Sequence, residues 1–176
     1  MNRRFFIIKF LFLIMVYFLL SSSSLAVMLG LGTEELTRGS ESVIIGEVED
    51  TEAQWSKDGK TIFTKAFIVV NEIIRGRTLQ KRITIEYEGG EIGDIGLKVS
   101  DVAPLEKGER VLLFLKSGKS RGDGFVYNIV GKAQGKYTID KERIARKRGF
   151  SVMSGEDIID NNIPLDELLK KIREVR

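Results

Sequence analysis

Short apolar segments of β-branched or alternating residues, bounded by glycine or charged turns, run through most of this 176-residue sequence. This pattern predicts strands, because residues two apart share one face of a strand. The expected strands are 43–48, 61–75, 82–88, 97–100, 110–116, 125–130 and 136–140. No strand–helix–strand alternation is present, so the pattern indicates an all-β fold rather than a parallel α/β sheet.

The expected architecture is a partly open OB-like β-barrel with short flanking helices, and a β-sandwich is the alternative. Residues 33–38 predict a short helix that begins at a capping threonine. Residues 57–60 contain an Asp-Gly pair and predict the turn of a hairpin. A C-terminal amphipathic helix is expected to dock on the barrel. Its apolar stripe consists of Leu165, Leu168, Leu169 and Ile172.

The first 26 residues have the three parts of a secretory signal. Positive charge precedes the uninterrupted apolar run 10–20, and small residues follow at Ser24 and Ala26. We therefore expect an exported protein, secreted, periplasmic or at the cell surface, whose mature chain begins near Val27. A leader retained as a membrane anchor is the alternative, and it would be the chain's contact with the membrane.

Beyond this leader we expect a β-barrel domain over residues 27–150, then a linker and the terminal helix over residues 151–176. The whole chain has 28 basic and 25 acidic residues, and three of the basic residues lie in the leader. The remainder is therefore neutral. A neutral domain gives no electrostatic reason to expect a nucleic-acid partner.

The sequence contains no histidine and no cysteine. This absence removes Ser-His-Asp triads, cysteine nucleophiles and ordinary zinc sites from consideration. We expect no catalytic residue, no cofactor and no metal site, and we interpret the chain as a non-enzyme.

Paired carboxylates are the chemistry that remains. Strand 82–88 alternates strictly, which places Glu86 and Glu88 on its outward face, with Glu91 and Asp94 following. We interpret this acidic group as a solvated face, and a carboxylate-dependent hydrolase is the least favoured reading.

Two segments are candidates for contacting a partner. Trp55, the only tryptophan, lies near the tip of the first predicted hairpin, where it is either an interface anchor or a cover for the barrel mouth. The glycine-rich loop 89–96 predicts positive φ angles or a close approach of the backbone to a neighbour. The candidate partner-binding residues are Trp55, Gly89, Gly90, Glu91 and Asp94.

Two further motifs have ordinary explanations. Arg121-Gly122-Asp123 spells a cell-adhesion tripeptide, but Gly and Asp are expected in a turn between strands. The basic segment 141–148 is expected to be a solvated linker, although it could contact anionic lipid or cell-wall polyanions.

Segments 40–48, 89–99 and 107–115, in that order, resemble a group of exported bacterial and archaeal proteins whose activity is not established. The double glycine at Gly89 and Gly90 is the most specific part of this resemblance. In that group a further glycine commonly stands at the place of Asp94, so the loop of this chain is less permissive.

The arrangement is also distantly similar to netrin-like modules, which include the tissue inhibitors of metalloproteinases and have an OB-type barrel. The shared pieces are residues 43–48, the strand ending at Arg75-Gly76, and Gly108 before the apolar strand 111–115. Those inhibitors depend on disulfides and on an amino-terminal cysteine, and this chain has neither, so the resemblance implies the fold without the inhibitory mechanism.

Together these features predict an exported, non-enzymatic binding module whose partner is a protein or a component of the cell envelope. A protease-inhibitor-like module is an alternative that rests on fold analogy alone.

Overall fold

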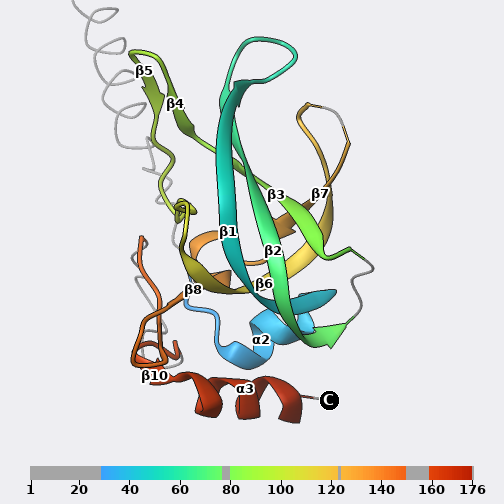
Figure 1. Ribbon diagram of the computed structural model, residues 1–176, viewed down its shortest axis with the longest axis vertical. Coiled ribbons are helices and arrows are strands. Elements are labelled where there is room, and N and C mark those ends of the chain that lie inside the picture. Colours follow the sequence, from blue (N-terminus) through green and yellow to red (C-terminus); the bar gives the residue numbers. More distant parts are fainter. Residues whose placement is uncertain (1–28, 77–79, 123, 150–158, 176) are drawn as a thin grey trace, which may run out of the picture.

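The computed structural model describes residues 29–76, 80–122, 124–149 and 159–175 (Figure 1). The predicted leader, residues 1–26, lies outside the described residues. Within the described residues, no helix has both the length and the apolar composition needed to cross a membrane.

Five strands close into a barrel. They are β1 (Ser42–Trp55), β2 (Ile62–Gly76), β3 (Arg82–Glu88), β6 (Arg110–Lys119) and β7 (Phe125–Ile129). Their order is β1-β2-β3-β7-β6, and β6 pairs back with β1. Strand β7 runs parallel to β3, whereas the other neighbours in the barrel are antiparallel. The predicted all-β, OB-like barrel is therefore confirmed, and the sandwich alternative is not what forms.

Smaller elements decorate the barrel. Strands β8 (Lys136–Ile139), β9 (Ile144–Arg146) and β10 (Ile163–Pro164) extend the sheet beyond β6. Strands β4 (Gly90–Ile92) and β5 (Ile95–Leu97) form a separate hairpin, so the predicted strand 97–100 is wrong. The helices are α2 (Thr33–Arg38), the 3₁₀ helix η1 (Lys132–Gly135) and α3 (Leu165–Glu174). Figure 1 shows α2 and α3 at one end of the barrel and the β1–β2 and β4–β5 hairpins at the other.

Strands β1 and β6 are apolar on both faces because each separates two hydrophobic cores. The barrel interior takes one face of each strand, including Ile44 of β1 and Leu113 of β6. The opposite faces, including Ile45 and Phe114, pack with both helices in a second core outside the barrel. Such two-sided burial explains why the sequence of these strands is almost continuously hydrophobic.

Helix α3 is part of this second core, as its apolar stripe predicts. Leu165, Leu168, Leu169 and Ile172 are all buried in it. The end of the helix is also held by Arg75 of β2, whose guanidinium donates to the carbonyl of Val175. The predicted docking of the terminal helix is confirmed.

Strands β1 and β2 pair over their whole length, with three register shifts along the way. Such irregularities bend and twist a strand pair. Gly46 lies at one of them, where an added Cβ would stand 2.6 Å from Cγ2 of Ile68 and 2.8 Å from the carbonyl oxygen of Val69. Strand β6 pairs with β1 only from Ser42 to Glu47. The far half of the β1–β2 hairpin therefore projects beyond the closed part of the barrel.

Candidate functional site

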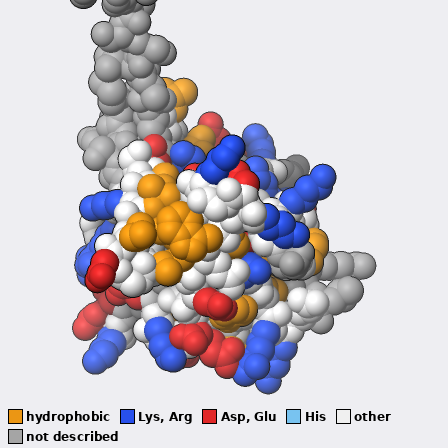
Figure 2. Space-filling view, turned by 90° about the horizontal axis from the view of Figure 1, so that it is seen from above, with side chains coloured by type: hydrophobic (Ala, Val, Ile, Leu, Met, Phe, Trp, Pro, Cys, Tyr) orange, Lys and Arg blue, Asp and Glu red, His pale blue; other side chains and the backbone are white. Residues whose placement is uncertain are grey.

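A half-open cavity of about 660 Å³ lies at the projecting end of the barrel. Its walls are Thr51, Ala53, Thr64, residues 87–91, residues 96–99, Val102 and Pro104. We call this cavity, together with Trp55 at its lip, the barrel mouth. Figure 2 looks onto this end of the molecule and shows hydrophobic side chains gathered on it, with charged side chains around them. Its volume lies within the range of ordinary ligand pockets, roughly 300 to 1,000 Å³.

Trp55 stands at the lip of the cavity. It shares one side of β1 with Thr51 and Ala53, because residues two apart on a strand point the same way and β1 has no register shift between them. Both of those residues line the cavity, and Trp55 is the next side chain outward. It remains 44% exposed. Trp55 is thus oriented toward the mouth and still accessible from outside.

The glycine-rich segment 89–96 is a β-hairpin rather than a loop, and it forms one wall of the cavity. Gly89 and Gly90 have φ angles of +101° and +139°, which favour glycine. A Cβ on Gly90 would stand 2.4 Å from Oγ1 of Thr64 and 3.0 Å from Cβ of Ala53. The Thr64 hydroxyl donates to the Gly89 carbonyl at 2.7 Å. These glycines therefore let the hairpin backbone pack directly on β1 and β2.

The structure brings together most of the candidate residues. Gly89, Gly90 and Glu91 line the cavity, and Trp55 lies at its lip. Asp94 is exposed in the turn between β4 and β5 and is not a lining residue. The two segments that the sequence singled out are therefore neighbours, and their partner-binding role stays a prediction.

Sequence reasoning did not select Tyr87 as a site residue, although the alternation of strand 82–88 places it on the face opposite Glu86 and Glu88. It lines the cavity, and its hydroxyl accepts a hydrogen bond from the backbone N–H of Leu105 at 3.3 Å. Burial raises the pKa of Tyr87 above its usual value, so the phenol is protonated at neutral pH. Tyr87 is therefore a neutral hydrogen-bonding group within a largely apolar cavity.

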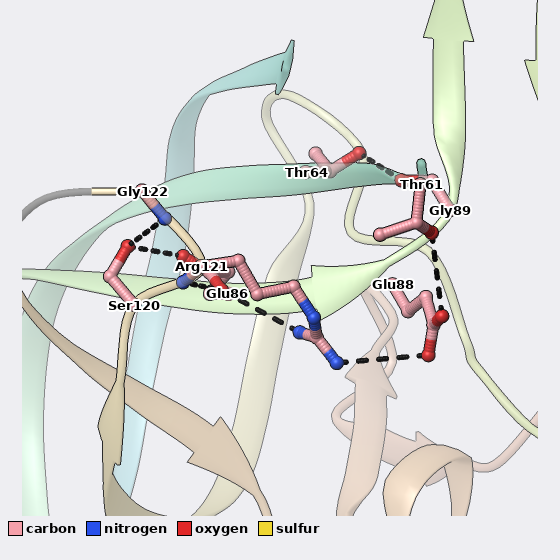
Figure 3. A network of polar contacts seen from close by, with 8 residues as sticks. All are labelled: Thr61, Thr64, Glu86, Glu88, Gly89, Ser120, Arg121 and Gly122. Carbon is pink, nitrogen blue, oxygen red and sulfur yellow. Dashed lines mark hydrogen bonds and ion pairs between the residues drawn. The ribbon is translucent and has the colours of Figure 1, made fainter. Parts of the chain in front are cut away.

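The interpretation of Glu86 as a solvated carboxylate is wrong. Its residue is only 2% exposed because the β6–β7 hairpin folds over the outer face of β3 (Figure 3). It accepts hydrogen bonds from the Ser120 hydroxyl at 2.6 Å and from the backbone N–H of Arg121 at 2.7 Å. The guanidinium of Arg121 lies 3.5 Å from Glu86 and 3.7 Å from Glu88. Glu86 thus anchors the hairpin and is not free for acid–base chemistry.

The same contacts bear on the adhesion-like tripeptide, since Arg121 is engaged within the molecule and Asp123 lies outside the described residues. The basic segment 141–148 is not a simple solvated linker, because part of it forms β9. Arg143 pairs with Asp166 at 2.7 Å and Arg146 pairs with Asp140 at 2.9 Å. In the described part of the chain, no group of three or more acidic side chains is placed to hold a metal ion.

Comparison of the chain with known protein families, with curated proteins and with solved structures finds no match. The resemblances to exported proteins and to netrin-like modules therefore stay predictions.

Proposed function

We propose that this chain is an exported, non-enzymatic binding module that captures its partner at the barrel mouth. The observation that carries the proposal is the half-open cavity with an accessible tryptophan at its lip. Pockets that combine an apolar lining with a few polar groups are the usual binding sites of proteins. Tryptophan is also among the residues that most often dominate binding energy at interfaces.

Binding is favoured over catalysis by the state of the carboxylates near the cavity. Glu86 is fully engaged with the β6–β7 hairpin. Glu88 lines the cavity but contacts Arg121 and the Thr61 hydroxyl, the latter at 3.5 Å. A hydrolase that uses two carboxylates needs one group to donate a proton and the other to act as base or nucleophile. Here the strand carboxylates serve to hold neighbouring segments in place.

The partner is proposed to be a protein or a component of the cell envelope. A photo-crosslinking residue in place of Ile95, which is 56% exposed on the β4–β5 hairpin, tests this in the full chain expressed in its own cells. We expect a discrete adduct from this position. The matched control is the same replacement at Lys170 on α3, whose side chain is 75% exposed at the other end of the molecule.

Trp55→Ala should then remove the adduct formed from position 95. Truncating an interface hot-spot tryptophan costs about 2 kcal/mol or more, which is roughly a thirtyfold loss of affinity. Circular dichroism should show a folded variant, because Trp55 is not a core residue. Equal adducts from both positions, or an adduct that Trp55→Ala leaves unchanged, would contradict the proposal.

A further inference from the structure

Strand β1 has an open edge next to the barrel mouth. Strand β2 pairs with one edge of β1 as far as Trp55, whereas β6 covers the other edge only as far as Glu47. Val48 then exchanges backbone hydrogen bonds with residues 108 and 109 at 2.8 and 3.0 Å. Among the described residues, no strand pairs with this second edge from residue 49 to residue 55. Backbone groups that point away from β2 therefore have no strand partner there within the described part of the chain.

The cavity lies beside this open edge and takes apolar side chains. Ala53, Leu97, Val99 and Val102 contribute aliphatic surface, and Tyr87 contributes an aromatic ring. Strand β5, on the opposite wall, pairs only with β4 within the described residues. An extended chain that enters between the β1–β2 and β4–β5 hairpins would thus find both a backbone to pair with and a pocket for a side chain.

Charged side chains of both signs surround the mouth (Figure 2). Glu52, Glu91 and Asp94 are exposed, and none has an ion partner among the residues that the structure describes. Lys98 is the cation that lines the cavity. Lys57 and Lys60 are also exposed, on the hairpin that carries Glu52, so acidic side chains are not in excess around the mouth.

The same acidic residues disfavour a second copy of this chain as the occupant. Charged residues on an open edge are a common device against edge-to-edge pairing of identical strands. Two copies paired along this edge would bring Glu52 and its equivalents close together. Glu49 and Asp50 are already neutralised by Arg82 at 2.5 Å and Lys107 at 3.3 Å, so they also hold neighbouring segments in place.

We infer that the barrel mouth binds an extended segment of a partner polypeptide, which adds as a strand to the open edge of β1 and places an aliphatic side chain in the cavity. This inference rests on the proposed function and names its partner class. In strand addition, main-chain hydrogen bonds supply affinity, and pockets for alternate side chains supply specificity. Trp55 would close over the inserted side chain from the lip.

The probe is a blocked eight-residue peptide that alternates lysine and valine, titrated into the full chain. Trp55, the only tryptophan, reports binding through a blue shift of its fluorescence, and calorimetry gives the affinity. The same peptide with alternate backbone nitrogens methylated should bind at least tenfold more weakly, because it lacks the donors that pair with β1.

Two variants separate the cavity from the general surface. Val99→Phe fills the cavity and should lower the affinity for the lysine–valine peptide at least tenfold. Val69→Phe, at another partly buried valine outside the cavity, should leave its affinity unchanged. Equal binding of the methylated peptide would overturn the inference, and so would the absence of any binding. If either result were found while the crosslinked adduct still formed from position 95, the proposed function would be retained and only strand addition would be rejected.

Discussion

Lys147 is a buried lysine that offers a direct test of the energetics of this fold. Its residue is 4% exposed, and its Nζ has no hydrogen-bond partner among the described residues. The ammonium lies 4.6 Å from the centre of the Tyr137 ring. Burial lowers the pKa of Lys147 from 10.5 to about 8, and the nearby charge of Asp160 opposes part of this shift. The folded protein therefore bears a cost for keeping this lysine protonated.

The size and pH dependence of the cost follow from the two pKa values. Each pKa unit corresponds to about 1.4 kcal/mol, so the shift is worth about 3 kcal/mol. Below pH 8 the lysine is charged in both states, and the folded state bears the full cost. Between pH 8 and 10.5 the unfolded state binds more protons than the folded one, so this lysine makes stability rise with pH in that window. Above 10.5 both states are neutral and the cost is gone.

Lys147→Met should therefore stabilise the protein at pH 7. The variant removes the desolvation cost but loses the ring contact, worth about 0.5 to 2 kcal/mol, so we expect a net gain of about 1 to 3 kcal/mol. Urea denaturation followed by circular dichroism at pH 7 and pH 11 measures the free energy of unfolding. The gain should disappear at pH 11. Lys170→Met, at an exposed lysine, is the control and should change little at either pH. A variant less stable than the parent at pH 7, or a gain that is the same at both pH values, would refute the reasoning.

Three further changes test the structure. Deleting residues 163–176 uncovers the second core and should lower the melting temperature by at least about 10 °C. The reason is that four buried side chains contribute about 1.5 to 3 kcal/mol each before entropy is subtracted. An unchanged melting temperature would contradict the docking of α3. Glu86→Gln should cost about 1.5 to 3 kcal/mol in urea denaturation, whereas Glu88→Gln, at a more exposed and loosely paired carboxylate, should cost under about 1 kcal/mol. Gly90→Ala should lower the free energy of unfolding more than Gly93→Ala in the same assay, because only the Cβ added at Gly90 meets a neighbouring side chain. Equal losses would show that backbone conformation alone matters.

Sequence patterns were sufficient to predict the elements that depend on interactions between residues close together in the chain. The turn of the first hairpin forms around Gly59 at φ +66°, and the Asp58 carboxylate accepts hydrogen bonds from the Ser56 hydroxyl at 2.5 Å and the Lys60 N–H at 3.2 Å. The apolar stripe of α3 likewise specified its buried face. Both features depend on residues within a few positions of each other, which is the range over which sequence patterns are informative.

The parts that sequence reasoning missed depend on distant residues. Alternation correctly placed Glu86 on the outer face of β3, but it could not show that a hairpin 34 residues away covers that face. The glycine density at 89–96 predicted a close backbone approach, and the structure shows that the neighbours are Thr64 and Ala53. The cavity itself combines segments from Thr51 to Pro104. No local pattern records which of these segments will meet.

The β1–β2 hairpin that presents Trp55 is held on both faces, and this has consequences for binding. Gly90 packs against Ala53 on one face, and Gly122 packs near Phe63 on the other, where an added Cβ would stand 3.3 Å from Cζ of Phe63. Glu86 fixes the second of these contacts through the β6–β7 hairpin. A rigid support reduces the conformational entropy lost when a partner binds. Glu86→Gln should therefore weaken capture at the barrel mouth although Glu86 itself does not line the cavity, so binding and hairpin stability should fall together in that variant.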